Sequence, residues 1–273
     1  MPALLMRAKR RMAAMNIVMI MSIMRTMNTA RTMDITGMNI DVPITAPAAG
    51  SAEPLPLPLF IWLSPAFPVG AFAYSHGLEW AVESGDVHDG EGLRLWLVDL
   101  IEHGSLCNDC VLVAAAWRAA GRAAELAEIN ALALALAPSA ERYLETSAQG
   151  NAFVKALAQA WPCSSPIGLA MDGADIAYPV ALGAAAADTS IGLEATLAAF
   201  TLAFEGNLAS AALRLGTIGQ SEALKLTASL LPLLQNLAHW AAQTTLDDLG
   251  GCAFRADIAS LRHETQYSRL FRS

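Results

Sequence analysis

From residue 60 onward, apolar residues recur at the spacing of amphipathic helices rather than in the strict alternation of strands. The stretch after Asp89 is a clear case, because an aspartate is a favoured N-cap and the apolar positions that follow lie at i, i+3, i+4, i+7 and i+8. These positions are Leu93, Trp96, Leu97, Leu100 and Ile101. The pattern predicts one amphipathic helix in this stretch.

The same spacing predicts a series of further helices. A second helix follows the stripe from Leu106 to Trp117, and a third opens near Ser139 and stops at Pro162. Gly150, in the third, lies where a neighbouring helix can approach closely. We therefore expect an all-α fold, a single compact multi-helix bundle that is held together by its buried stripes more than by helix propensity.

Three more helices are predicted in the C-terminal half. Asp188 and Thr189 are expected to cap a helix whose apolar face is Leu193, Leu197, Phe200 and Phe204. The next helix covers residues 221–243 with a kink at Pro232, and the last covers residues 252–263. The last helix is expected to bury the stripe Phe254, Ile258 and Leu261.

The N-terminal segment differs from the rest in composition. Ten of the 11 methionines lie within the first 38 residues, and residues 41–58 contain five prolines. The basic start resembles a targeting sequence but has no cleavage site directly after its apolar stretch, so the alternatives are a targeting sequence or an upstream extension before a true start at Met33 or Met38. We expect residues 1–56 to be a disordered extension and linker, 57–265 the helical domain, and 266–273 a C-terminal tail.

Composition narrows the classes of partner. Apolar residues make up 55% of the chain and charged residues 15%, which leaves apolar surface that a partner or a membrane would cover. Residues 34–273 hold 11 basic and 25 acidic residues, a net charge of −14, which argues against nucleic-acid binding and suits a basic partner or a cation. Every long apolar run beyond residue 33 carries a charge or a breaker, so we expect no membrane span. The hydropathy and the basic start nevertheless leave a membrane-associated helical protein as an alternative function. Four scattered cysteines favour a reducing cytoplasm.

One motif segment, residues 64–79, carries a family resemblance. Its sequence, SPAFPVGAFAYSHGLE, is similar to the signature opening of the urease accessory protein family UreF. Further matches occur in the family's order: Glu145-Thr146, Gln149-Gly150, Tyr178-Pro179-Val180, Asn207-Leu208, Ser210-Ala211-Ala212, Gly219-Gln220 and Tyr267 to Ser273. The resemblance covers residues 57–273. It departs after Gln220, where the family often has a second Gly-Gln pair and this chain has Ser221-Glu222.

The resemblance implies an all-α protein that acts without catalysis or cofactor. Such a protein dimerises, pairs with the accessory protein UreD (also called UreH) and recruits the GTPase UreG. The assembly delivers nickel to apo-urease. The family has also been proposed to modulate GTP hydrolysis by UreG.

The motif segment is a candidate partner-binding site. Pro65 and Pro68 fix φ and remove two backbone donors, so the loop is stiff and loses little entropy on docking. It is either a rigid connector or a face presented to a partner. The candidates are Ser64, Pro65, Phe67, Pro68, Gly70, Phe72, Tyr74, Ser75, His76 and Glu79, with Gln149 and Gln220 from the later matches.

The tail is the second candidate site. It is either a solvated end or an anchor in which Leu270 and Phe271 fill pockets on UreD while Arg269 and Arg272 pair with carboxylates. Its candidate residues are Tyr267, Arg269, Leu270, Phe271, Arg272 and Ser273.

Two smaller features also carry chemistry. His103, Cys107 and Cys110 share one helical face and could bind nickel or zinc, which leaves a metallochaperone as an alternative function, although a free cysteine is also a common core residue. Arg214 is either an arginine finger for UreG or a cation at a helix end. The sequence has no phosphate-binding loop and no nucleophile elbow, so we expect no enzyme and no cofactor.

Overall fold

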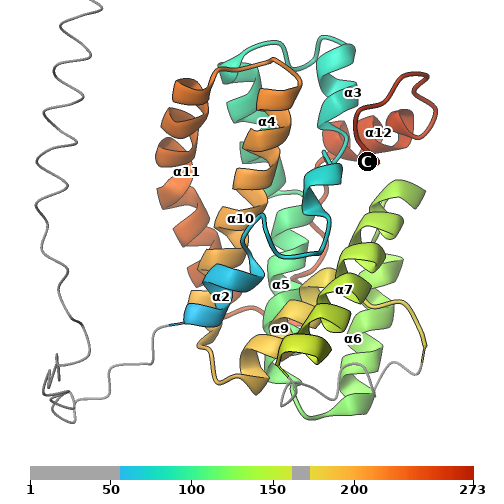
Figure 1. Cartoon of the computed structure of the whole chain (residues 1–273), viewed down its shortest axis with the longest axis vertical. Helices are drawn as coiled ribbons and strands as arrows, with labels where there is room; N and C mark the ends of the chain where they lie inside the picture. The colour runs from blue at the N-terminus through green and yellow to red at the C-terminus, as the bar shows by residue number, and fades with distance from the viewer. Residues whose placement is uncertain (1–55, 162–172) are drawn as a thin grey trace, which may run out of the picture. The chain divides into compact units, whose positions relative to one another are not determined.

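Helix α5 (Ser105–Arg118) is the helix around which the others pack (Figure 1). It contacts α4 (Gly90–Glu102), α6 (Ala123–Ala135), α9 (Tyr178–Asp188), α10 (Leu193–Arg214) and α11 (Gln220–Ala241). The computed structural model describes residues 56–161 and 173–273, and all the regular elements in these ranges are helices. The all-α prediction is therefore confirmed.

The remaining elements lie around this centre. They are α2 (Leu57–Trp62), η2 (Ala71–Ala73), α3 (Leu78–Glu83), α7 (Ala140–Ala160), η3 (Leu246–Asp248) and α12 (Phe254–His263). Helix α12 packs beside α3 and contacts α7, whereas α7 packs on α9 (Figure 1). The segments that carry the motif and the tail therefore meet at one end of the bundle. Of the predicted extension and linker, residues 1–56, all but Pro56 lie outside the described residues.

Two helices begin where the sequence predicts, α4 after its N-cap Asp89 and α7 after Ser139. The side chain of Asp89 accepts a hydrogen bond from the Gly92 amide at 2.8 Å, and Ser139 accepts one from the Arg142 amide at 3.1 Å. All five stripe residues of α4 are buried, with 0–2% of each side chain exposed. Burying one such residue is worth about 1.5–3 kcal/mol, so these stripes supply most of the stability of the helix.

The start of α10 differs from the prediction. Asp188 ends α9 and Thr189 is its C-cap, so the pair does not open α10, which begins after Gly192. The reason is that the alanine-rich stretch before Asp188 continues a buried helix, and Ser190, with φ 58°, then turns the chain.

The predicted stripe of α12 points the wrong way. Phe254, Ile258 and Leu261 are exposed by 73%, 55% and 49%, whereas the buried face is Ala256, Ala259, Ser260 and His263. Small residues let α12 approach α3 so closely that a Cβ on Gly77 would lie 2.7 Å from the Ser260 nitrogen. Backbone proximity and a buried histidine decide this face, not apolar area.

Helix α10 is long and apolar enough to cross a membrane by length and composition alone. Half of its most apolar window is buried inside the bundle, as expected for a core helix. Glu205 lies fully buried within it and accepts a hydrogen bond from Thr227 at 2.9 Å. The helix packs on α5 and α11.

The close approach predicted at Gly150 gives a direct test of the packing. A Cβ there would lie 1.9 Å from the carbonyl oxygen of Ile176, which is backbone and cannot move aside easily. Gly150→Ala should therefore lower the free energy of unfolding by about 2–4 kcal/mol. Gly206→Ala is the matched control, because a Cβ there meets nothing within 4 Å and alanine should stabilise the helix by up to about 1 kcal/mol. Urea denaturation followed by circular dichroism measures both, and equal stability of the two variants would contradict the packing.

Candidate partner-binding site

The motif segment is built as a stiff connector from α2 to α3. Gly70 (φ 75°), His76 (φ 54°) and Gly77 (φ 76°) adopt left-handed conformations that turn the chain around η2. Phe67 is buried and packs on the ring of Phe153, with centroids 5.4 Å apart. The loop is thus fixed on the bundle by its own aromatic residue, which agrees with the rigid connector.

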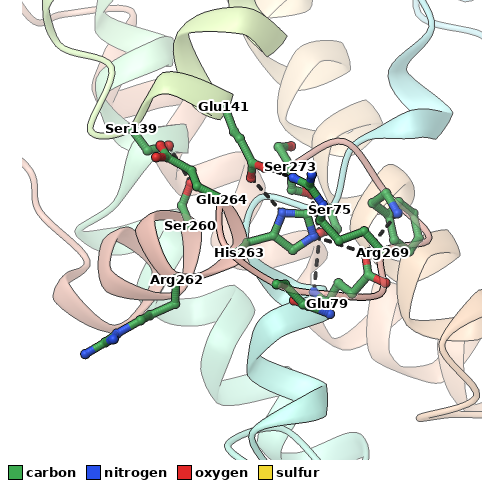
Figure 2. A network of polar contacts seen from close by, with 12 residues as sticks. Ser75, Glu79, Ser139, Glu141, Ser260, Arg262, His263, Glu264, Arg269 and Ser273 are labelled. Atoms are coloured by element: carbon green, nitrogen blue, oxygen red, sulfur yellow. Dashed lines mark hydrogen bonds and ion pairs between the residues drawn. The ribbon is translucent and has the colours of Figure 1, made fainter.

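One buried carboxylate, that of Glu79, ties the tail to this segment (Figure 2). Its two oxygens accept hydrogen bonds from the backbone amides of Leu270 at 2.6 Å and Phe271 at 2.8 Å. The same side chain lies 3.1 Å from Nε2 of His263. Amide hydrogen bonds to an ionised acceptor are about twice as strong as neutral ones, so this contact holds the tail firmly.

A second carboxylate extends the network from α7. Glu141 lies 2.6 Å from Nδ1 of His263 and accepts a hydrogen bond from Arg269 at 2.7 Å (Figure 2). His263 is fully buried, and both of its ring nitrogens face carboxylate oxygens, which only accept. Through these two contacts His263, on α12, joins α3 to α7.

The motif segment and the tail also pair through their backbones. The amide of Ser75 donates to the backbone oxygen of Ser273 at 2.7 Å, and the amide of Arg272 donates to the oxygen of Ala73 at 2.8 Å. The Ser273 hydroxyl donates to Glu145 at 2.7 Å. The two candidate sites therefore form one surface, although some 200 residues separate them in the sequence.

Glu145 is the most strongly stabilised anion in this region. Burial alone would raise its pKa, but Arg142, His76 and the Ser273 hydroxyl outweigh burial and hold the pKa at about 2. The His76 Nε2 atom lies 2.8 Å from this carboxylate and 3.2 Å from Nη1 of Arg142. Burial, followed by the charge of Arg142, lowers the pKa of His76, and the ring stays neutral at pH 7.

Arg214 links the same two segments. Its guanidinium lies 3.5 Å from the ring centroid of Phe72 and 4.2 Å from that of Phe271. Its Nη1 atom donates to the carbonyl oxygen of Phe72 at 2.6 Å. Arg214 is the last residue of α10. Its observed contacts are within its own chain, where it joins the motif segment to the tail. A role as an arginine finger stays a prediction.

The predicted site residues divide by exposure. Buried within the chain are Phe67, Tyr74, Ser75, His76, Glu79, Gln149, Phe271 and Ser273. Half-buried are Ser64 and Arg214, and exposed are Pro65, Pro68, Gly70, Phe72, Gln220, Tyr267, Arg269, Leu270 and Arg272. Phe271 fills a pocket of its own chain in this conformation. The surface that a partner can reach is therefore the exposed set, which the buried set holds in place.

The residues that hold this surface in place were not predicted from the sequence. Glu141, Arg142 and His263 were not singled out, and Glu145 was noted only as a family match. No local pattern marks these charged residues as buried, because the apolar period of the last helix assigns Phe254, Ile258 and Leu261 to the core and leaves out His263. Such residues are found buried only where partners satisfy them, and here they satisfy one another.

The predicted metal ligands do not converge. Cys110 is fully buried in the core, and burial, with Asp109 and Cys107 nearby, raises the pKa of its thiol well above the usual value. His103 is exposed on the turn before α5. Among the described residues, no three His, Cys, Asp or Glu side chains are arranged to hold a metal ion, so the geometry does not support this site.

The fold and the joined segments define an all-α protein with a preordered surface. The UreF family model matches residues 87–231 of the chain. Urease accessory protein UreF of Methylobacterium radiotolerans is 53% identical over 220 residues, covering 80% of this chain and 96% of its own. UreF of Mesorhizobium japonicum is 54% identical over 217 residues (80% and 96%), and that of Xanthobacter autotrophicus is 52% identical over 235 residues (84% and 96%). The chain belongs to the UreF family of urease accessory proteins.

The depressed pKa of Glu145 predicts how stability depends on pH. The folded-state value of about 2 lies below the ordinary 4.5, so the contribution of Glu145 is complete above about pH 4.5 and is lost as the pH falls toward 2. The contribution is roughly 3 kcal/mol. The difference in unfolding free energy between the wild type and Glu145→Gln should stay nearly constant from pH 6 to about pH 5 and then shrink as the pH falls to 3. A difference that stays constant over this range, measured by urea denaturation, would refute the assignment.

Proposed function

We propose that this chain is a non-catalytic scaffold for nickel insertion into apo-urease. In this role it binds UreD (UreH) and then recruits UreG, and the assembly delivers nickel as cargo to the urease active site. The proposal rests on membership of the UreF family, whose members are named as urease accessory proteins. Modulation of GTP hydrolysis by UreG belongs to the same proposal.

The observation that supports the UreD step most directly is the exposure of large apolar side chains on an anchored tail. Tyr267 is 105% exposed and Leu270 is 62% exposed, yet the backbone at Leu270 is bonded to Glu79. Apolar and aromatic groups on a preordered segment bind without a large ordering cost. The free cysteines Cys107, Cys110 and Cys252 are consistent with a reducing, cytoplasmic setting.

Co-expression with UreD tests this step. The double variant Tyr267→Ala, Leu270→Ser removes two exposed apolar groups and leaves the backbone hydrogen bond to Glu79 intact, so helicity should not change. Two such interface groups are worth about 2 kcal/mol or more, which predicts at least a tenfold loss of captured UreD. UreG should bind only where the UreD complex has formed.

Leu132→Ser on α6 is the control, because this leucine is also exposed, by 37%, but is remote in sequence from both segments. Capture of UreD by the double variant at wild-type yield, with the control also at that yield, would overturn the assignment of the tail to UreD.

Homodimer formation is the second part of the proposal, and a groove between α2, α10 and α11 suits it. The groove has a volume of about 400 Å³, and all of its lining residues are uncharged. Large exposed apolar side chains on these helices are Leu57, Phe60, Ile61, Leu202, Leu224, Leu231 and Trp240. Because the body of the chain is strongly acidic, a patch that carries no charge is a surface on which two copies repel each other least.

Sedimentation equilibrium tests the dimer. The wild type should have twice its chain mass of 28.8 kDa at micromolar concentration, and Phe60→Ser combined with Leu202→Ser should be monomeric. The same Leu132→Ser control should remain dimeric. A wild type that is monomeric at 50 µM, or a double variant that stays dimeric, would contradict the proposal.

A further inference from the structure

A cavity of about 590 Å³ lies between the motif segment and helices α5, α7, α9 and α10. Its walls are apolar and largely aromatic, with Phe67, Phe72, Tyr178, Phe200 and Phe204 among them. Pro65, Gly70, Phe72 and Gly206 are exposed at its rim, so the cavity opens to solvent. Volume and lining are those of a small-molecule site, in which apolar walls surround a few polar groups.

The polar groups of the cavity lie together on one side, and one of them has no partner. His76, Arg142, Glu145 and Gln149 bond to one another. Asp109 of α5 also lines the cavity and is part-exposed there, but it makes no hydrogen bond or ion pair with any described residue. An unpaired carboxyl in such a place is costly unless a ligand or a proton satisfies it.

The charged side chains around Asp109 indicate whether the cavity favours a positively or a negatively charged ligand. Arg142 is the one cation on the lining, and it is already paired with Glu145. With Asp109 ionised, the charges on the lining sum to −1, so an anion would face two carboxylates and a cation would restore neutrality. Aromatic rings on the walls favour a cation further, because their faces carry negative charge.

We propose that this cavity binds a primary alkylammonium group, whose ammonium pairs with Asp109 while its alkyl chain lies against the aromatic walls. The group belongs either to a free aliphatic amine or to a lysine side chain of a bound protein, and the chemistry is the same in both cases. This site lies beyond the scaffold function proposed above and does not depend on it.

The state of Asp109 makes the binding dependent on pH. Burial raises its pKa to about 7, although Arg142 opposes the shift and Glu145 adds to it. The other titratable groups that face it do not change charge near neutrality: Glu145 is ionised, Arg142 is cationic, His76 is neutral, and burial raises the pKa of Cys110 and Tyr178. Affinity for a cation should therefore rise between pH 6 and pH 8.

Calorimetric titration of the full chain, with no other urease protein present, tests the proposal. The probes are n-hexylammonium, n-hexanol and n-hexanoate. Hexylammonium should bind saturably and at least tenfold more tightly than hexanol at pH 8, and hexanoate should not bind. Asp109→Asn should lose most of this preference while still binding hexanol, which also shows that its cavity is intact.

Asp247→Asn, on the exposed η3, is the matched control and should bind as the wild type does. Nα-acetyl-lysine methylamide distinguishes the two sources: its binding indicates a lysine side chain, and binding of hexylammonium alone indicates a free amine. The proposal is overturned if wild-type affinity for hexylammonium does not exceed that for hexanol, does not rise from pH 6 to pH 8, or is absent at 10 mM. Any of these results would leave the scaffold proposal standing, because no partner is involved.

Discussion

The hydrogen bonds from two tail amides to the carboxylate of Glu79 are the contact on which the candidate surface depends. Together with the backbone bonds between Ser75 and Ser273 and between Arg272 and Ala73, they fix a segment that would otherwise have the freedom of an ordinary chain end. With them, the tail lies against the motif segment, and Arg214 is held between Phe72 and Phe271. His263 is equally important, because its two ring nitrogens lie between two buried carboxylates, those of Glu79 and Glu141, and contact both.

The helical core could be predicted from the sequence because its signal is local. The stripe of α4 and the caps at Asp89 and Ser139 depend only on residues within a few turns of one another. The close contact at Gly150 was foreseen for a similar reason: a glycine in a helix is costly unless something approaches it. These features follow from spacing and need no knowledge of what lies across the bundle.

The face of α12 and the polar network could not be predicted, because both depend on partners distant in the sequence. His263 is buried because Glu79 and Glu141, more than 120 residues earlier, lie on either side of it. Once that face is fixed, Phe254, Ile258 and Leu261 point outward whatever their hydrophobicity. In the tail, the motif match pointed to Leu270 and Phe271 alike, and only the fold separates Phe271, which is buried against its own chain, from Leu270, which is exposed.

The central claim is that the surface is preordered in the free chain, so hydrogen exchange at the tail amides tests it most directly. The Leu270 and Phe271 amides should exchange at least 100-fold more slowly than in an unstructured peptide, which corresponds to about 2.7 kcal/mol of local stability. Glu79→Ala should remove this protection and leave that of the α4 amides unchanged. Tail amides that exchange at the unstructured rate in the wild type would contradict the account.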